Sequence, residues 1–331
     1  MKRMSVACSA VCAGAAVVAF AACAGGGVGG PSGPTGVRSD PAAAAADRGE
    51  RGRSWMAPDA RNGDLLYVAD GGTGDVDVYS YPSAQTEGVL TGFAAPHGEC
   101  VDKAGNVFIT NTGASDILEY AHAGTTPIAS LPDAGYSPVG CAVDPTTGDL
   151  AVTNLTVATG SGPGNLLIFR HAKGTPKIYT TQNVYYYYFC GYDDTGNLYV
   201  DGNTQHIGAF EFAELPVGRK NFKSITLNQT IQMPGGVQWD GTYVAVEDRG
   251  VASQGSVIYQ FAIHGSAGTE AGTTPLTGST EVSTFWIQGA TVIGPNAAGN
   301  VLFWHYPAGG AAKKTIDGFG NPLGVTVSRQ T

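Results

Sequence analysis

Short runs of alternating apolar and polar residues, separated by Asp, Gly and Asn, recur along most of the chain. Residues 96–111 are typical, with two apolar runs joined by the turn Asp102-Lys-Ala-Gly-Asn106. The Asp side chain can accept hydrogen bonds from backbone amides two residues on, and Gly tolerates positive φ, so each pair of runs predicts a tight hairpin. Because the apolar residues alternate with period two, the pattern predicts strands rather than helices, and the fold class is all-β.

The hairpin unit is an internal repeat. Its first strand begins at corresponding positions, spaced by about 45 residues, which are Pro96, Pro138, Tyr187, Pro234, Val282 and Pro322. A third strand follows each hairpin, at residues 76–79, 117–120, 166–169, 209–212, 257–261 and 301–304, and a fourth is carried by segments such as 127–131 and 223–227. Four strands at this interval are the period of a propeller blade. The sequence therefore predicts one six-bladed β-propeller over residues 54–331, with four antiparallel strands per blade.

The last repeat, at Pro322, is truncated after its first strand. A ring of blades leaves an open strand edge unless its last and first blades are joined. The first blade needs such help, because its own first strand, at residues 55–58, is interrupted by Pro58. We expect residues 322–328 to pair within the first blade and so to close the ring.

The N-terminus reads as an export signal. Lys2 and Arg3 precede an uncharged, weakly apolar stretch over residues 6–22, which is short for a membrane span but suits a signal peptide over residues 1–22. The end, Phe20-Ala-Ala-Cys23, resembles the lipobox of bacterial lipoproteins, in which the cysteine is lipidated, although Phe20 stands where that motif usually has Leu. Ordinary cleavage and secretion is the alternative. Residues 23–53 then form a disordered tether, since they contain almost no large apolar side chain.

Composition narrows the possible partners. The net charge is −9 and no stretch clusters Lys and Arg, which argues against nucleic acid. The phrase Asp193-Asp-Thr-Gly-Asn-Leu-Tyr-Val200 resembles the NHL and SMP-30/gluconolactonase-like six-bladed propellers. Residues 54–331 are more closely similar to a group of bacterial lipoprotein propellers that carry no assigned activity, which share phrases such as the one at 235–241, Gly-Gly-Val-Gln-Trp-Asp-Gly.

The resemblance to gluconolactonases implies a metal held by a Glu near the start of the first blade and by Asn and Asp residues of the channel. This chain has Trp55-Met-Ala-Pro58 at that place, without a carboxylate. Asn154 and Asp201 are the remaining candidates for metal ligands. We therefore expect no cofactor, with Ca or Zn as the alternative, and we expect a non-catalytic protein, with a metal-dependent lactonase as the alternative.

The repeat also suggests where a ligand would bind. The starts of first strands and the ends of second strands lie on one face of a propeller, at the mouth of the central channel. Polar side chains and one tyrosine of the run at 185–188 gather there, and these candidates are His97, Glu99, Asn111, Asn154, Tyr186, Asp201 and Asp248. The competing interpretation is that the Asn and Asp residues cap strand ends, and that the tyrosines pack between blades.

Three cysteines remain after export, Cys100, Cys141 and Cys190, all in first strands. If a disulfide forms, it joins Cys100 to Cys141, but we expect buried free thiols. The sequence as a whole predicts an exported, lipid-anchored propeller that acts as a binding or scaffold protein of the cell envelope. Its partner is an unidentified protein or small molecule on the channel face, and a carbohydrate bound by the tyrosines is a further alternative.

Overall fold

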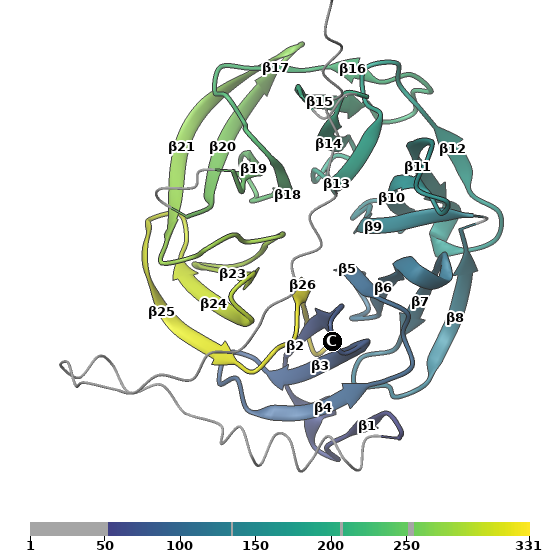
Figure 1. The fold of residues 1–331 in the computed structure, drawn as a ribbon, viewed down its shortest axis with the longest axis vertical. Coiled ribbons are helices and arrows are strands. Elements are labelled where there is room, and N and C mark those ends of the chain that lie inside the picture. The colour runs from purple at the N-terminus through teal and green to yellow at the C-terminus, as the bar shows by residue number, and fades with distance from the viewer. Residues whose placement is uncertain (1–51, 134, 206–207, 251–254) are drawn as a thin grey trace, which may run out of the picture. The chain divides into compact units, whose positions relative to one another are not determined.

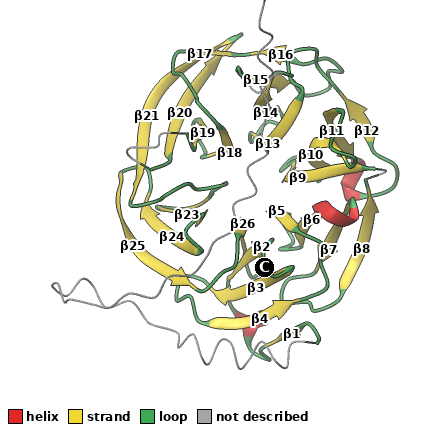
Figure 2. Ribbon diagram, viewed as in Figure 1, coloured by secondary structure: helices red, strands yellow, loops and turns green. Residues whose placement is uncertain are grey.

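The structure is a computed structural model that describes residues 52–133, 135–205, 208–250 and 255–331. The signal peptide, the lipidation site Cys23 and nearly all of the tether lie outside the described residues. Strands make up almost all of the regular structure, as the alternating pattern predicts, with three short 3-10 turns between them (Figure 2). None of the described helices is long and apolar enough to cross a membrane.

Consecutive strands pair in antiparallel order to form four-stranded sheets. The second sheet contains β5 (Pro96–Val101), β6 (Val107–Asn111), β7 (Asp116–Tyr120) and β8 (Pro127–Pro132). The third contains β9 (Tyr136–Val143), β10 (Leu150–Val157), β11 (Pro163–Phe169) and β12 (Lys177–Tyr179). The fourth contains β13 (Tyr186–Tyr192), β14 (Leu198–Asn203), β15 (Phe210–Leu215) and β16 (Lys223–Ser224).

A larger sheet of nine strands follows. Its first antiparallel run is β18 (Pro234–Trp239), β19 (Val244–Asp248), β20 (Val257–His264) and β21 (Ala267–Thr277). Its second is β22 (Trp286–Gln288), β23 (Thr291–Asn296), β24 (Asn300–His305) and β25 (Gly309–Asp317). The two runs are joined by parallel pairing of β21 with β25, and β17 (Thr226–Leu227) also pairs with β21.

The first sheet has strands from both ends of the described chain. Its order is β1 (Trp55–Met56), β4 (Thr86–Leu90), β3 (Asp75–Ser80), β2 (Leu65–Asp70) and β26 (Pro322–Ser328). The expected pairing of 322–328 within this sheet is therefore observed, from Leu65 opposite Ser328 to Asp70 opposite Pro322. The expectation for residues 55–58 was wrong: β1 pairs with β4 at the outer edge, because β26 already occupies the inner position.

We call the edge strands β26, β5, β9, β13, β18 and β22 the inner strands. Those of them that Figure 1 labels, β26, β5, β9, β13 and β18, lie nearest a common centre. Each contacts the next, and β22 contacts β26. The hydrophobic cores lie between neighbouring sheets and their runs, so each sheet is buried on both faces. This explains why strands such as β2 and β6 are apolar almost throughout.

Glycines let the inner strands approach closely near their starts. A Cβ at Gly98 of β5 would lie 2.4 Å from the carbonyl oxygen of Val139 in β9. A Cβ at Gly324 of β26 would lie 1.9 Å from the carbonyl oxygen of His97 in β5. Both distances are shorter than any real side chain tolerates, so the backbones touch at this level, and only Gly fits.

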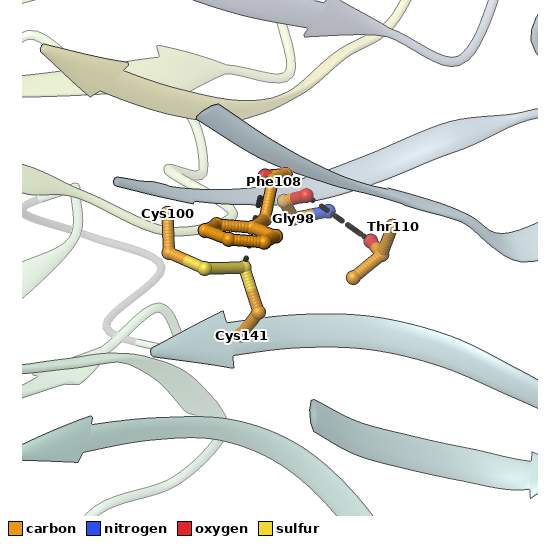
Figure 3. Close-up of a disulfide and its surroundings, with 5 residues drawn as sticks. All are labelled: Gly98, Cys100, Phe108, Thr110 and Cys141. Carbon is orange, nitrogen blue, oxygen red and sulfur yellow. Dashed lines mark hydrogen bonds between the residues drawn. A yellow bond between two sulfur atoms is a disulfide. The ribbon is translucent and has the colours of Figure 1, made fainter. Parts of the chain in front are cut away.

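A disulfide joins Cys100 of β5 to Cys141 of β9, with the Cα atoms 5.7 Å apart (Figure 3). The expectation of free thiols was wrong for this pair and agrees with the structure only for Cys190, which is free and buried. The two residues occupy neighbouring repeat columns, so their side chains leave their strands in opposite directions. On adjacent inner strands these directions meet, which places the sulfur atoms within bonding distance.

Candidate functional site

Two ends of the inner strands matter for the site. We call the end where these strands begin, near Pro96, Pro138 and Pro234, the start face, and the end that carries the Asp/Gly hairpins the turn face. The sequence places its candidate site on the start face. The structure shows where each of those side chains lies and which of them come together.

Asn111 and Asp248 bind loop backbone at the ends of second strands. The Oδ1 atom of Asn111 accepts a hydrogen bond from the amide of Ala94 at 2.6 Å. The carboxylate of Asp248 accepts from the amides of Gln232, Met233 and Gly250, at distances of 2.9 to 3.1 Å. Both side chains are buried, and their oxygen atoms accept hydrogen bonds from backbone amides of nearby loops. Their geometry is that of the strand-end caps described as the competing interpretation.

Asn154 belongs to a buried polar group in the third sheet. Its amide nitrogen donates to Asp133 at 3.1 Å and to Asn165 at 2.8 Å. Burial raises the pKa of Asp133 to about 7, and the hydrogen bond from Asn154 opposes that rise. The Oδ1 atom of Asn154 has no hydrogen-bond partner among the described residues.

Asp201 supports an irregularity that recurs in the inner strands. The pairing of β13 with β14 shifts register between Tyr187 and Cys190, and Asp201 accepts a hydrogen bond from the amide of Phe189 in that bulge at 2.8 Å. Glu247 accepts from the amide of Gly236 in the corresponding bulge of β18 at 3.0 Å. These carboxylates occupy equivalent positions in their sheets and satisfy bulge amides that the ladder leaves unpaired.

The same two carboxylates are part of a polar cluster that also contains His97, Tyr188 and Arg249. The guanidinium group of Arg249 lies 5.4 Å from the ring centre of Tyr188. Burial raises the pKa of Asp201 well above its usual range and that of Glu247 to about 8, and the charge of Arg249 opposes both shifts. Burial, together with Arg249, lowers the pKa of His97 to about 4. At neutral pH this cluster therefore holds neutral His97 and Glu247 beside a permanent cation.

The remaining candidates lie elsewhere. Tyr186 packs edge-on against Tyr185, with ring centres 4.8 Å apart. Glu99 is 7% exposed, and neither of its carboxylate oxygens has a hydrogen-bond partner among the described residues. Asn154 and Asp201, the candidate metal ligands, are hydrogen-bonded to different parts of the structure. Over the described ranges, no group of three or more His, Cys, Asp and Glu side chains is arranged to hold a metal ion.

A cavity of about 310 Å³ lies between the inner strands and reaches the turn face. All six inner strands contribute to its wall, and it extends to Pro145 and Asp194 in the Asp/Gly hairpins. Trp239 and Trp286 line it, and the Nε1 atom of Trp239 has no hydrogen-bond partner in the described structure. Each inner strand also pairs on one side only, so unpaired backbone edges face the centre.

A wider hollow of about 810 Å³ lies on the turn face itself. It shares Val101, Val143, Pro145 and Trp286 with the cavity, so the two spaces adjoin. Lys103 and Arg329 lie on its wall together with acidic side chains of the hairpins. We call the two spaces together the turn-face funnel.

The sequence analysis missed this end of the molecule. Of the seven start-face candidates, only Glu99 borders the cavity. A signal was present, because two of the four tryptophans of the chain lie in first strands near their turns: Trp239 ends β18, and Trp286 begins the short strand β22. Large aromatic side chains near a channel mouth indicate a binding surface more directly than strand-end Asn and Asp, which also serve as caps.

Comparisons with known proteins bear on the fold. No protein-family model matches the chain, and no curated protein matches it significantly. A chain in a crystal structure of a nidogen/laminin complex is similar to it, with a TM-score of 0.66 and 13% identity over 81% of this chain and 100% of that one. A protein of unknown function from Bacteroides caccae is also similar, with a TM-score of 0.58 and 12% identity over 81% of this chain and 99% of that one. The architecture and these similarities together show a β-propeller fold.

Proposed function

We propose that the protein is a non-catalytic binding protein of the cell envelope that takes a small molecule in the turn-face funnel. The observation that carries this proposal is the cavity of about 310 Å³ whose lining includes Trp239 and Trp286. Ligand sites span roughly 300–1,000 Å³ and combine apolar walls with a few polar groups. The cavity fits the lower end of that range, which corresponds to a ligand of about one ring.

The wall indicates the kind of ligand. Indole faces of Trp239 and Trp286 suit the flat apolar side of a sugar or an aromatic ring. The free Nε1–H of Trp239 and the unpaired strand edges offer donors and acceptors to hydroxyl groups. A carbohydrate is therefore the ligand that we favour, held by these tryptophans in place of the tyrosines at 185–188.

The finer architecture is also part of the proposal. We interpret the nine-stranded sheet as two blades, β18–β21 and β22–β25, whose outer strands are joined by the short parallel pairing. With the other four sheets this makes six blades, and β26 closes the ring. The repeat interval and the contact of β22 with β26 support this interpretation. The resemblance to NHL and SMP-30-like propellers remains at the level of sequence phrases.

Anchoring is proposed from sequence alone. Cys23 in the lipobox-like segment would carry the lipid, and residues 24–53 would hold the propeller away from the membrane surface. Secretion after simple cleavage remains the alternative. The exported location agrees with the Cys100–Cys141 disulfide, since such bonds persist in oxidising compartments.

A ligand screen tests the binding proposal. Titration of monosaccharides and small aromatic compounds should quench the fluorescence of Trp239 and Trp286, and Trp239→Phe with Trp286→Phe should abolish the response. Trp55→Phe is the matched control, because Trp55 is 39% exposed on β1 at the outer edge. Ligands that bind the double variant as tightly as the native protein would place the site outside the funnel.

The lactonase alternative has its own test. Metal analysis of the purified protein and a lactone-hydrolysis assay should be run together on the native protein, Asn154→Ala and Asp201→Ala. We expect no stoichiometric Ca or Zn and no hydrolysis, because the hydrogen bonds of Asn154 and Asp201 point to different partners. Bound metal with activity lost in both variants would replace the binding proposal by the enzyme.

A further inference from the structure

One buried carboxyl breaks the pattern of the inner strands. Three residues after each repeat position, the side chain packs against the preceding sheet. Those residues are Cys141, Cys190, Val237, Phe285, Val325 and, in β5, Glu99. Five are apolar or sulfur-containing and one is acidic, so Glu99 places a carboxyl where the other strands have core residues.

The surroundings of Glu99 do not compensate for its burial. It is 7% exposed, and both carboxylate oxygens lack a hydrogen-bond partner among the described residues. Burial raises the pKa of Glu99 well above its usual range, and the backbone N–H of Ala69, which lies near the carboxyl without meeting hydrogen-bond geometry, opposes that rise. The core between the first two sheets, which includes Tyr67 and Ile109, is apolar. Buried charges in proteins are paired or coordinate metals, so a carboxyl in this position requires an explanation.

The disulfide shows what faces Glu99. It joins the fifth residue of one repeat, Cys100, to the fourth residue of the next, Cys141. The glycine contacts show that β26 meets β5 in the same register as β5 meets β9. Gly324 approaches the carbonyl oxygen of His97, and Gly98 approaches the equivalent carbonyl oxygen of Val139. The fifth residue of the repeat in β26 is Thr326, so Thr326 faces Glu99 as Cys100 faces Cys141.

Thr326, like Glu99, is a buried polar residue whose side-chain oxygen is not hydrogen-bonded among the described residues. It is 0% exposed, and its Oγ1 atom has no hydrogen-bond partner in the described structure. By this register, three oxygen atoms without hydrogen-bond partners among the described residues lie on the facing sides of β26 and β5, beside the central cavity, to which Glu99 and Val325 contribute. The unpaired edges of the two strands add backbone carbonyl oxygens.

We propose that Glu99 and Thr326 bind a monovalent cation, Na⁺ or K⁺, between β26 and β5. Oxygen ligands without nitrogen or sulfur suit hard cations. One carboxylate neutralises one positive charge, so a divalent ion held by Glu99 would leave a net charge in a largely apolar core. The ion enters from the cavity and connects the C-terminal strand to the second sheet, where the disulfide performs the same task between the second and third.

Thermal unfolding tests the site. The native protein is melted at pH 8 in NaCl, KCl or N-methyl-D-glucamine chloride at equal ionic strength, since the last cation is too large for the site. A ligand that binds only the folded state raises Tm with the logarithm of its concentration, here by about 3 °C or less per tenfold increase. Glu99→Gln and the isosteric Thr326→Val should abolish this response.

Glu247→Gln is the matched control, because Glu247 is, like Glu99, a buried glutamate with an unpartnered carboxylate oxygen, but it lies in the β18–β19 hairpin. It should retain the cation response. If the Tm of Glu99→Gln responds to the cation as strongly as the Tm of the native protein, the response arises at the protein surface and the proposal is overturned. A native protein whose Tm does not depend on the cation would also overturn it. If Glu99→Gln does not fold, rubidium-soaked crystals decide: an anomalous peak between Glu99 and Thr326 is expected, and its absence refutes the site.

Discussion

Removal of the Cys100–Cys141 disulfide is the perturbation whose effect can be worked out most directly. The bond closes a loop of 41 residues. Loop-closure entropy in the unfolded chain gives a stabilisation of about 4 kcal/mol at 25 °C for a loop of this length. A folded unit of roughly 280 residues has an unfolding entropy near 0.6 kcal/mol/K, so the loss corresponds to a fall in Tm of about 7 °C.

The assay compares the native protein with Cys100→Ala/Cys141→Ala, by calorimetry and by denaturant titration, with and without reductant. Reductant should lower the Tm of the native protein towards that of the double variant and leave the variant unchanged. Cys190→Ala is the control: Cys190 is a free, buried thiol, so its loss costs packing energy but should leave the response to reductant intact. Alkylation of the unfolded, unreduced protein should modify Cys190 and neither partner of the disulfide.

A double variant within about 1 kcal/mol of the native protein would refute the loop-closure reasoning. It would mean that the unfolded chain is already compact around this loop, or that strain in the folded state offsets the entropy. Alkylation of Cys100 and Cys141 without reductant would refute the disulfide itself and restore the expectation of free thiols.

Three further predictions follow from other parts of the chain. Cys23→Ser should move the protein from the membrane fraction to the soluble fraction, and equal partitioning of both forms would favour simple secretion. Because Glu247 has a folded-state pKa of about 8, above that of the unfolded chain, it binds its proton more tightly when folded. Its contribution to stability should therefore fall as the pH rises from about 5 to about 8, and Glu247→Gln should flatten that part of a Tm–pH profile. Gly98→Ala should lower Tm by several degrees, because the new Cβ would lie 2.4 Å from the Val139 carbonyl oxygen, whereas Gly63→Ala meets nothing within 4 Å. Equal Tm values for these two variants would show that the inner strands can separate without cost.

Much of the fold was readable because the repeat is local. The Asp/Gly hairpins and the strands around them depend on residues a few positions apart. The truncated copy at Pro322 predicted pairing within the first blade, and the structure shows that its partner there is β2. The positions of functional side chains were harder to predict. A bulge near the start of each inner strand shifts the alternation, so the direction of residues such as Glu99 and Tyr186 cannot be counted from a simple period of two.

Contacts between sheets could not be predicted either. Cys100 and Cys141 meet only because glycines bring neighbouring inner strands into backbone contact, and the distance between two strands cannot be derived from the sequence pattern. The turn-face funnel was not predicted for a related reason. The strand-end Asn and Asp residues favoured a site on the start face, although there they bind loop amides. Trp239 and Trp286 were not included among the candidate residues.

The pairing of β26 with β2 also constrains the order in which the molecule can be made. Leu65 cannot gain its inner partner until Ser328 has left the ribosome, more than 250 residues later in the sequence. During synthesis the first sheet therefore stays incomplete until β26 is available to pair with β2. The same arrangement brings β1 and β26 into one sheet. A circular permutant would link residue 328 to residue 54 and place its new termini in a loop that connects two sheets. In this permutant the pairing of β26 with β2 becomes a local contact that forms early, so we expect the permutant to fold faster than the native protein.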